Sequence, residues 1–215
     1  MTQLPLPITW SQRTDASRLL VTPCNAAAFA LLRDWANWPS PCTLLVGPRR
    51  SGRSLMGRLF ESESGGRLVD DAEKRDEEEL FHLWNEARDT GRPMLLIAQH
   101  VPPAWHIHLP DLRTRLATAA LARVLPPDEN VVAALITHGL ERAGSAFAPD
   151  LPDFVARRVT RYYETVDNVI SCLNAESLAS GRKLTVASAR VVLERDGFIA
   201  QELPLDMDGG PETSG

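Results

Sequence analysis

Between residues 25 and 125, short uninterrupted apolar runs alternate with longer segments whose apolar residues have helical spacing. Apolar runs of this kind are typical of strands that are buried on both faces of a parallel sheet. Alternation of such strands with helices indicates an α/β fold with right-handed crossovers. The pattern predicts strands at residues 43–46, 68–69, 94–98 and 123–125, and helices from Ser54, from Asp76 and from Pro110.

Capping residues and helix breakers predict where the helices begin and end. A helix before the first strand has Asn25 as its predicted N-cap and stops at Pro39. Asp76 is followed by Glu79 at the spacing of a capping box, and Gly91 is placed to end that helix.

The alternation stops at residues 126–128, which read Pro-Pro-Asp. Beyond them only helical periodicity remains, and Thr185 is a predicted N-cap. The predicted helices are 129–143, 151–159, 161–180 and 186–195. The expected organisation is an N-terminal arm at 1–10, an α/β domain at 11–125, a small all-helical domain at 126–202 and a polar tail at 203–215.

Residues 47–54 carry the most specific chemical pattern. They read Gly-Pro-Arg-Arg-Ser-Gly-Arg-Ser, which is the phosphate-loop pattern with Arg53 where lysine is usual. The loop follows a predicted strand and opens a helix, so its amides and the helix N-terminus can surround a phosphate, and the Ser54 hydroxyl can reach Mg²⁺. The alternative is an irregular glycine turn. The predicted nucleotide-binding residues here are Gly47, Pro48, Arg50, Ser51, Gly52, Arg53 and Ser54.

Arginine at position 53 changes what this loop is expected to do. It keeps the positive charge of lysine, but its guanidinium is planar and longer. Phosphate binding should therefore survive better than the γ-phosphate geometry that hydrolysis requires, so weak or absent intrinsic turnover is expected.

Two carboxylates, Asp70 and Asp71, follow the second predicted strand. After a phosphate loop, this arrangement predicts that Asp70 supports Mg²⁺ and that Asp71 faces the attacking water. The alternative is a pair of solvated loop residues.

Other polar residues carry weaker patterns. His106 and His108 lie in a proline-rich loop without a third ligand nearby, so a metal site is not expected there. On the residues alone, Arg113, Arg115 and Arg161 are exposed charges on helices.

The N-terminal arm combines one amide with alternating apolar residues in a proline-rich, extended frame. Because proline lowers the entropy cost of ordering an extended ligand, this segment is a candidate for docking in a groove on a partner. The alternative is an inert terminus. The residues concerned are Gln3, Leu4, Leu6, Pro7 and Ile8.

Composition excludes several classes of protein. With 23 basic and 28 acidic residues the net charge is −5, and no cationic stripe is present, so DNA binding through bulk charge is not expected. No apolar run approaches the roughly 18 residues of a membrane span, and the N-terminus lacks the pattern of an export signal. Three scattered cysteines, Cys24, Cys42 and Cys172, form no disulfide framework. These features predict a protein of the reducing cytoplasm.

Together these blocks resemble the DnaA-related AAA+ family of bacteria, and within it the Hda-like regulators that inactivate DnaA after replication has started. The similarity covers almost the whole chain. It is carried by residues 47–54 as Walker A, 68–72 as Walker B, and the blocks 78–85, 95–98 and 109–116. The resemblance implies a P-loop parallel-sheet domain followed by a small all-helical lid domain.

The resemblance also implies roles for single residues. The arginine before the last leucine of block 109–116 is an arginine finger in Hda-like proteins, and it falls on Arg115. The sensor II arginine of the lid falls on Arg161. The arm at Gln3 to Ile8 is similar to the peptide that docks such proteins on the sliding clamp.

The chain departs from the family pattern in three places. Only thirteen residues separate Ser54 from Leu68, which implies a shortened sheet that lacks one strand and its helix. The sensor I position, near Gln99, lacks the usual Ser, Thr or Asn, although Gln99 could donate to phosphate. Nothing after the lid resembles the DNA-binding domain of DnaA, so direct recognition of origin DNA is not expected.

The resemblance thus implies a negative regulator of replication initiation that binds ADP or ATP with Mg²⁺. It would dock on the sliding clamp, the β subunit of DNA polymerase III, and present Arg115 to ATP held by DnaA. A homodimer is left open. The alternatives are a clamp or DnaA adaptor with a degenerate, nucleotide-free P-loop, and a self-contained P-loop NTPase.

Overall fold

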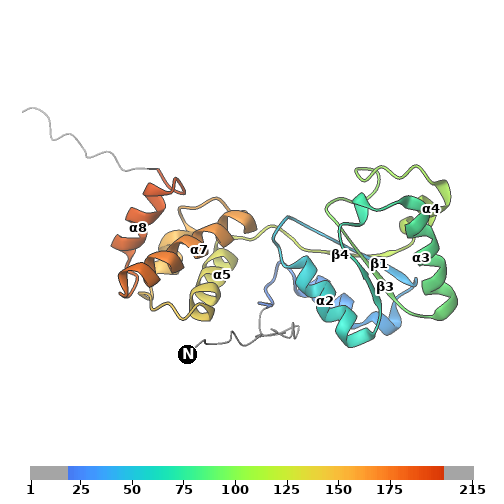
Figure 1. The fold of residues 1–215 in the computed structure, drawn as a ribbon, viewed down its shortest axis with the longest axis horizontal. Helices are drawn as coiled ribbons and strands as arrows, with labels where there is room; N and C mark the ends of the chain where they lie inside the picture. The colour runs from blue at the N-terminus through green and yellow to red at the C-terminus, as the bar shows by residue number, and fades with distance from the viewer. Residues whose placement is uncertain (1–18, 201–215) are drawn as a thin grey trace, which may run out of the picture.

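The computed structural model describes residues 19–200, which form an α/β unit and a helical unit joined by one extended segment (Figure 1). The α/β unit is built on a four-stranded sheet in the order β2-β3-β1-β4, and every strand pair is parallel. The strands are β1 (Cys42–Val46), β2 (Arg67–Val69), β3 (Met94–Ala98) and β4 (Ala120–Arg123). The predicted parallel α/β fold is confirmed.

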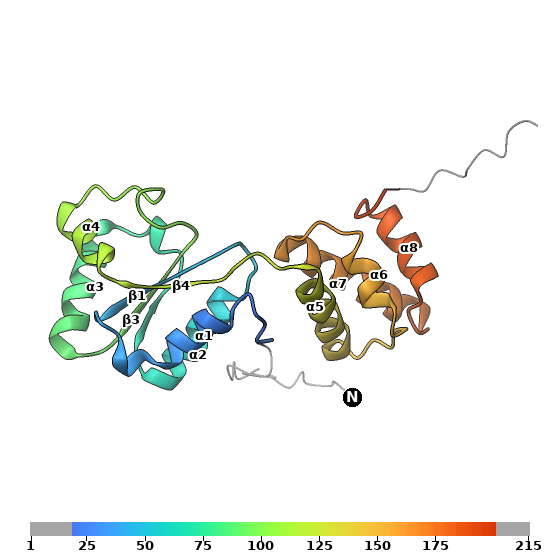
Figure 2. The ribbon, with the colours of Figure 1, turned by 180° about the vertical axis from the view of Figure 1, so that it is seen from behind.

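Helices cover both faces of this sheet (Figures 1 and 2). Leu45, Leu95 and Ile97 face α1 (Ala26–Arg33) and α2 (Arg53–Ser64). Leu44 and Leu96 face α3 (Glu77–Thr90) and α4 (Pro110–Ala117). Both faces of β1 and β3 are therefore buried, which explains why these strands read as continuous apolar runs. Short 3₁₀ turns, η2 (Trp35–Asn37) and η3 (Ala72–Lys74), complete the unit.

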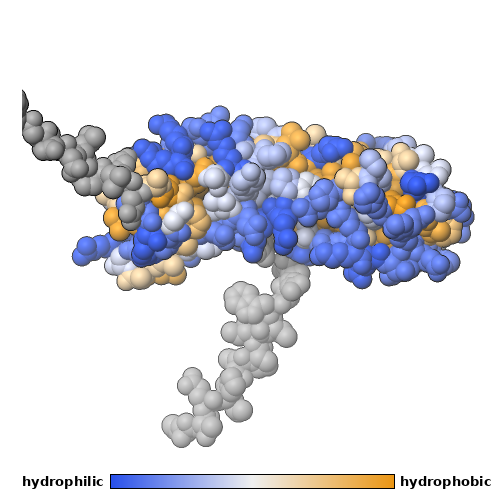
Figure 3. Space-filling model, turned by 90° about the horizontal axis from the view of Figure 1, so that it is seen from above, coloured by the Kyte–Doolittle hydropathy of each residue, from blue (hydrophilic) through white to orange (hydrophobic). Residues whose placement is uncertain are grey.

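Four helices with their own apolar core form the second unit, here called the lid. They are α5 (Glu129–Arg142), α6 (Leu151–Ala156), α7 (Tyr163–Ser180) and α8 (Val186–Arg195). Ile136, Leu140, Val166 and Leu173 are among the buried residues that hold them together. Viewed from above, the molecule is largely hydrophilic, with separate apolar patches over each unit (Figure 3). Among the described helices, none has the length and apolarity needed to span a membrane.

Two predicted N-caps are confirmed, and the third residue precedes its helix without making a capping hydrogen bond. The Asp76 side chain accepts a hydrogen bond from the Glu79 amide at 2.9 Å, and Thr185 forms a capping box with Ser188. Asn25 precedes α1 but does not cap it: its Oδ1 accepts from the Thr22 amide instead. The local turn thus competes successfully for the asparagine side chain.

Some predicted element boundaries are wrong. The fourth strand lies at Ala120–Arg123 rather than 123–125, because the run Ala-Leu-Ala, which has little strand propensity of its own, pairs with β1. Two lid helices are shorter than expected: α6 ends at Ala156, and α7 begins at Tyr163, two residues after Arg161.

The shortened sheet is confirmed. After α2 the chain passes through two glycines directly into β2, and no other strand lies between them in this fully described stretch. Gly57 brings α2 close to the sheet, since a Cβ at this position would lie 2.7 Å from Leu68 Cδ1 and 2.8 Å from Ile97 Cδ1. Helix α2 is therefore itself the crossover from β1 to β2, and it packs directly on β2 and β3.

Candidate functional site

The phosphate loop follows β1 and opens α2, as the sequence predicts. Gly47 passes so close to the end of β4 that a Cβ would lie 2.7 Å from the carbonyl oxygen of Val124. Gly52, at the start of α2, has a φ of 84°, and Arg50 also lies in the left-handed region with a φ of 60°. These turns place the free amides of the first turn of α2 at the carboxyl edge of the sheet.

Arg53 joins this loop to the other strands of that edge. Its guanidinium donates to the carbonyl oxygen of Ala98, the last residue of β3. Burial lowers the pKa of Arg53, while attraction to Asp70 and Asp71 opposes that shift. The structure therefore brings the residues resembling Walker A and Walker B together.

A cavity of about 240 Å³ lies between these groups. Asp71 on its wall is bonded to Lys74 at 2.7 Å, and this contact holds the pKa of the Asp71 carboxyl below its usual value. The cavity is lined by Arg49, Arg50, Arg53, Asp71, Glu73, Lys74 and Gln99. Its cationic side chains make it suited to an anionic ligand.

A second cavity, of about 290 Å³, lies between the phosphate loop, the segment before α1, and helices α5 and α7 of the lid. We call it the inter-unit cavity. Ser51 lines it, is 6% exposed, and has a buried hydroxyl without a hydrogen-bond partner among the described residues. Arg50 joins the two units here, since its Nη1 lies 2.5 Å from Oδ2 of Asp167 on α7. A loop hydroxyl that is buried and unpaired beside a cavity fits a site for a polar ligand.

The chain also supplies the oxygen ligands that Mg²⁺ prefers. Ser54 offers a hydroxyl in the first turn of α2, and Asp70 follows β2. One oxygen of Asp70 accepts the Asp71 amide at 2.9 Å. Neither Ser54 nor Asp70 lines the two cavities at the loop, and the described residues contain no group of three or more His, Cys, Asp or Glu side chains that could hold a metal. The magnesium site stays a prediction.

The structure does not place Arg161 beside the phosphate loop. Arg161 precedes α7, and its guanidinium bonds Oε2 of Glu129 at 2.9 Å within the lid. Neither cavity at the loop includes it among its lining residues. Its sensor role stays a prediction.

Arg115 lies on α4 and packs against α3. Its guanidinium stacks on Trp84 and Phe81, with the guanidinium carbon 4.1 Å and 4.7 Å from the two ring centres. Nη1 also donates to Oδ1 of Asn85 at 3.0 Å. The charge is thus held against an aromatic surface of its own unit, away from the residues that line the phosphate-loop cavities.

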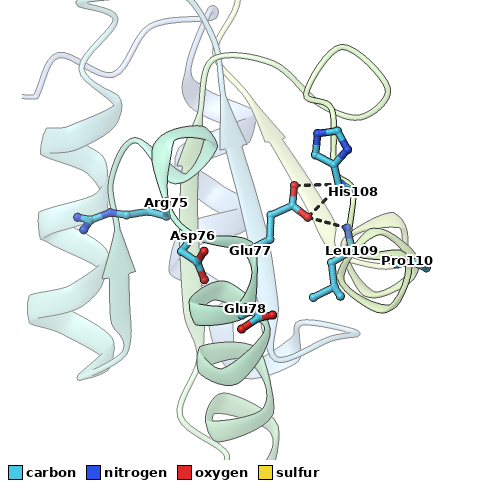
Figure 4. A pocket seen from close by; sticks show the side chains of 7 residues that line it. All are labelled: Arg75, Asp76, Glu77, Glu78, His108, Leu109 and Pro110. Carbon is cyan, nitrogen blue, oxygen red and sulfur yellow. Dashed lines mark hydrogen bonds between the residues drawn. The ribbon is translucent and has the colours of Figure 1, made fainter.

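Glu77 ties the start of α4 to the start of α3 (Figure 4). Its carboxylate accepts the His108 amide at 2.9 and 3.0 Å and the Leu109 amide at 2.6 Å. These bonds favour the charged form and lower the pKa of the Glu77 carboxyl. A cavity of about 530 Å³ lies beside this contact. Sequence reasoning missed Glu77, because a glutamate in the first turn of a helix resembles any favourable surface charge.

The arm residues predicted to bind the clamp, Gln3 to Ile8, lie outside the described residues.

No family model matches the sequence, but the fold is similar to that of several solved structures. Domain III of the Thermotoga maritima replication initiation protein DnaA has a TM-score of 0.71 at 18% identity, over 85% of this chain and 95% of that chain. AMPPCP-bound DnaA from Aquifex aeolicus has a TM-score of 0.64 at 13% identity, over 83% and 66% of the two chains. The RuvB Holliday junction branch migration motor of T. maritima has a TM-score of 0.58 at 12% identity, over 80% and 66%. The chain therefore has the fold of an AAA+ domain.

The Glu77 contact makes a prediction about stability and pH. Replacing Glu77 by Gln should lower the free energy of unfolding at pH 7 by about 1 kcal/mol, because two backbone amides lose a charged acceptor. The carboxylate stabilises the fold above the ordinary glutamate pKa of about 4.3, and this contribution disappears as the pH falls through the lower pKa of the folded state. Urea unfolding at pH 7 and at pH 3 measures both effects.

Glu78→Gln is the matched control, because Glu78 is exposed in the same helical turn. Its unfolding free energy should stay within about 0.5 kcal/mol of the unsubstituted protein. Equal losses in the two variants would show that the Glu77 bonds contribute nothing specific.

Proposed function

We propose that this protein is a nucleotide-binding AAA+ regulator of DNA replication initiation, of the Hda-like kind. The observation that carries the proposal is the phosphate loop between β1 and α2, where Ser51, whose hydroxyl is buried and unpaired among the described residues, lines the cavity shared with the lid. The likeness to DnaA domain III supports it. A DnaA with this fold binds the adenine nucleotide analogue AMPPCP, and we infer that ADP or ATP occupies the same region here.

The site's own residues define how a nucleotide would be held. The amides of residues 47–54 and the N-terminus of α2 bind phosphate oxygens, and the guanidinium groups of Arg49 and Arg53 offset their charge. Ser54 and Asp70 would hold Mg²⁺, which neutralises phosphate charge when it is bound. The apolar part of the inter-unit cavity then receives the nucleoside.

Two contacts favour nucleotide retention over hydrolysis. Arg53 donates to Ala98, so its guanidinium is partly committed to the sheet. Asp71, the residue expected to face the attacking water, is paired with Lys74. A carboxylate that is already neutralised is a weak base and a poor orienting group for water. We therefore infer slow intrinsic turnover and a regulatory role.

In that role Arg115 acts on a nucleotide held by another protein. A guanidinium inserted beside a neighbour's ATP offsets charge in the transition state of phosphoryl transfer and accelerates hydrolysis about 10³–10⁵-fold. We propose that the neighbour is DnaA, and that the arm at Gln3 to Ile8 docks the protein on the sliding clamp. The function would then be to inactivate DnaA once a clamp is present on DNA.

Nucleotide binding predicts a thermal shift. At a free ADP–Mg²⁺ concentration 100 times the dissociation constant, the folded state should gain about 2.7 kcal/mol and the melting temperature should rise by several degrees. Ser54→Ala should reduce the shift, and Arg58→Ala, an exposed change on the same helix, should leave it unchanged. No shift at millimolar ADP would favour the nucleotide-independent adaptor.

The arginine finger is tested by the rate at which DnaA hydrolyses ATP in the presence of clamp-loaded DNA. Arg115→Ala should remove most of the stimulation, by a factor on the order of 10³ if the full effect of a finger is lost. Arg113→Ala, on the exposed side of the same short helix, should retain it. Equal stimulation by both variants would remove Arg115 from the mechanism.

Clamp docking is tested by pull-down on immobilised clamp. Replacing Gln3 and Leu6 by Ala should abolish retention, because the amide and one apolar anchor of the extended peptide are both lost. Gln12→Ala removes the same kind of amide outside the arm and should retain binding. Unchanged retention of the double variant would show that the arm has no part in docking.

A further inference from the structure

A second buried polar atom belongs to a residue that lines the inter-unit cavity. Nε2 of His138, on α5, is buried and has no hydrogen-bond partner among the described residues, and His138 lines this cavity together with Ser51. Leaving a buried polar group unpaired costs about 1–3 kcal/mol, so such atoms call for a specific explanation. The Ser51 hydroxyl belongs to the phosphate loop of the α/β unit, and His138 Nε2 belongs to the lid.

Packing of the lid fixes where His138 lies. Its neighbour Gly139 touches α7 so closely that a Cβ would lie 2.8 Å from Cδ1 and Cγ2 of Ile170. On the other side of α5, Ile136 and Leu140 are buried in the lid core. His138 is thus held on the wall that the lid presents to the cavity.

Several other polar side chains of the cavity already have partners. Asn25 donates to the Leu20 carbonyl, Arg50 is paired with Asp167, and the Tyr163 hydroxyl donates to the Leu125 carbonyl. The remaining walls include the apolar side chains of Leu19, Leu20, Leu55, Leu135 and Ile170. The cavity therefore combines apolar walls with the cationic side chain of Arg142 and with unpaired atoms on Ser51, at the phosphate loop, and on His138, in the lid.

This pattern matches the chemistry of a nucleoside. The apolar walls suit a planar base, while a neutral imidazole nitrogen is either a donor or an acceptor according to its tautomer. A ribose hydroxyl both donates and accepts, so it can pair with either tautomer. A phosphate oxygen accepts only and would pair with the donor form alone.

We propose that His138 recognises the ribose of the bound nucleotide through a hydrogen bond from or to Nε2. The inference rests on the proposed nucleotide binding and adds a specificity residue to it. Because His138 belongs to α5, the lid then contacts the nucleoside while the loop holds the phosphates. Binding of a complete nucleotide, but not of a diphosphate alone, would engage both units.

The test is calorimetric titration of the full chain with four Mg²⁺-loaded probes: ADP, 2′-deoxy-ADP, 3′-deoxy-ADP and inorganic pyrophosphate. The unsubstituted protein should bind ADP at least about 10-fold more tightly than one of the deoxy analogues, which corresponds to one lost hydrogen bond of about 1.4 kcal/mol. His138→Ala should lose that discrimination and leave pyrophosphate affinity unchanged.

Two further variants test whether a loss of discrimination in His138→Ala comes from the missing hydrogen bond or from a change in the fold. His138→Gln keeps a side chain that can donate or accept and should retain part of the discrimination. Glu141→Ala, an exposed change on the same helix, should behave like the unsubstituted protein. Thermal unfolding without ligand checks that each variant is folded.

Three results would overturn the inference. The first is an unsubstituted protein that binds ADP but does not discriminate against either deoxy analogue. The second is a folded His138→Ala variant that discriminates as well as the parent. The third is a variant that loses ADP and pyrophosphate to the same extent. Failure of the unsubstituted protein to bind ADP at all is a separate result, because it contradicts the proposed function itself.

Discussion

The close approach of Gly47 to Val124 is the contact on which the site depends. It fixes the end of β1 against the end of β4, where the phosphate loop begins and the segment leading to the lid departs. Just beyond it, the Leu125 amide donates to the Cys24 carbonyl and the Leu125 carbonyl accepts the Tyr163 hydroxyl. The backbone at Val124 and Leu125 therefore contacts the phosphate loop, the segment before α1 and the first residue of α7. A side chain at position 47 would disturb all three.

Charge at the carboxyl edge of the sheet underlies our proposal that the site binds nucleotide better than it hydrolyses it. Arg49 and Arg53 supply positive potential for phosphates, and Asp70 and Asp71 lie close enough to Arg53 to raise its pKa against the effect of burial. Lys74 neutralises Asp71 in turn. The acidic residues thus favour the charged form of Arg53 in the loop, and this balance is the basis on which we propose slow turnover.

Features set by local chemistry could be predicted from the sequence, and features set by distant contacts could not. The phosphate loop, the Asp76 and Thr185 caps and the short path from α2 to β2 all follow from neighbouring residues. The position of β4 depends on pairing with β1, and the Asn25 side chain is used by a turn rather than by the helix. The positions of His138 beside a cavity and of Glu77 beside the backbone of residues 108–109 result from folding, so the sequence did not predict them. Their sequence neighbourhoods are those of ordinary helix residues.

The central claim is that one nucleotide spans the phosphate loop and the lid, and hydrogen exchange of backbone amides tests it most directly. On addition of ADP–Mg²⁺ to the full chain, residues 47–54 and residues 135–142 should become protected over the same concentration range, because a single ligand orders both. Protection confined to the loop, or no protection in either segment at saturating ADP, would contradict the account.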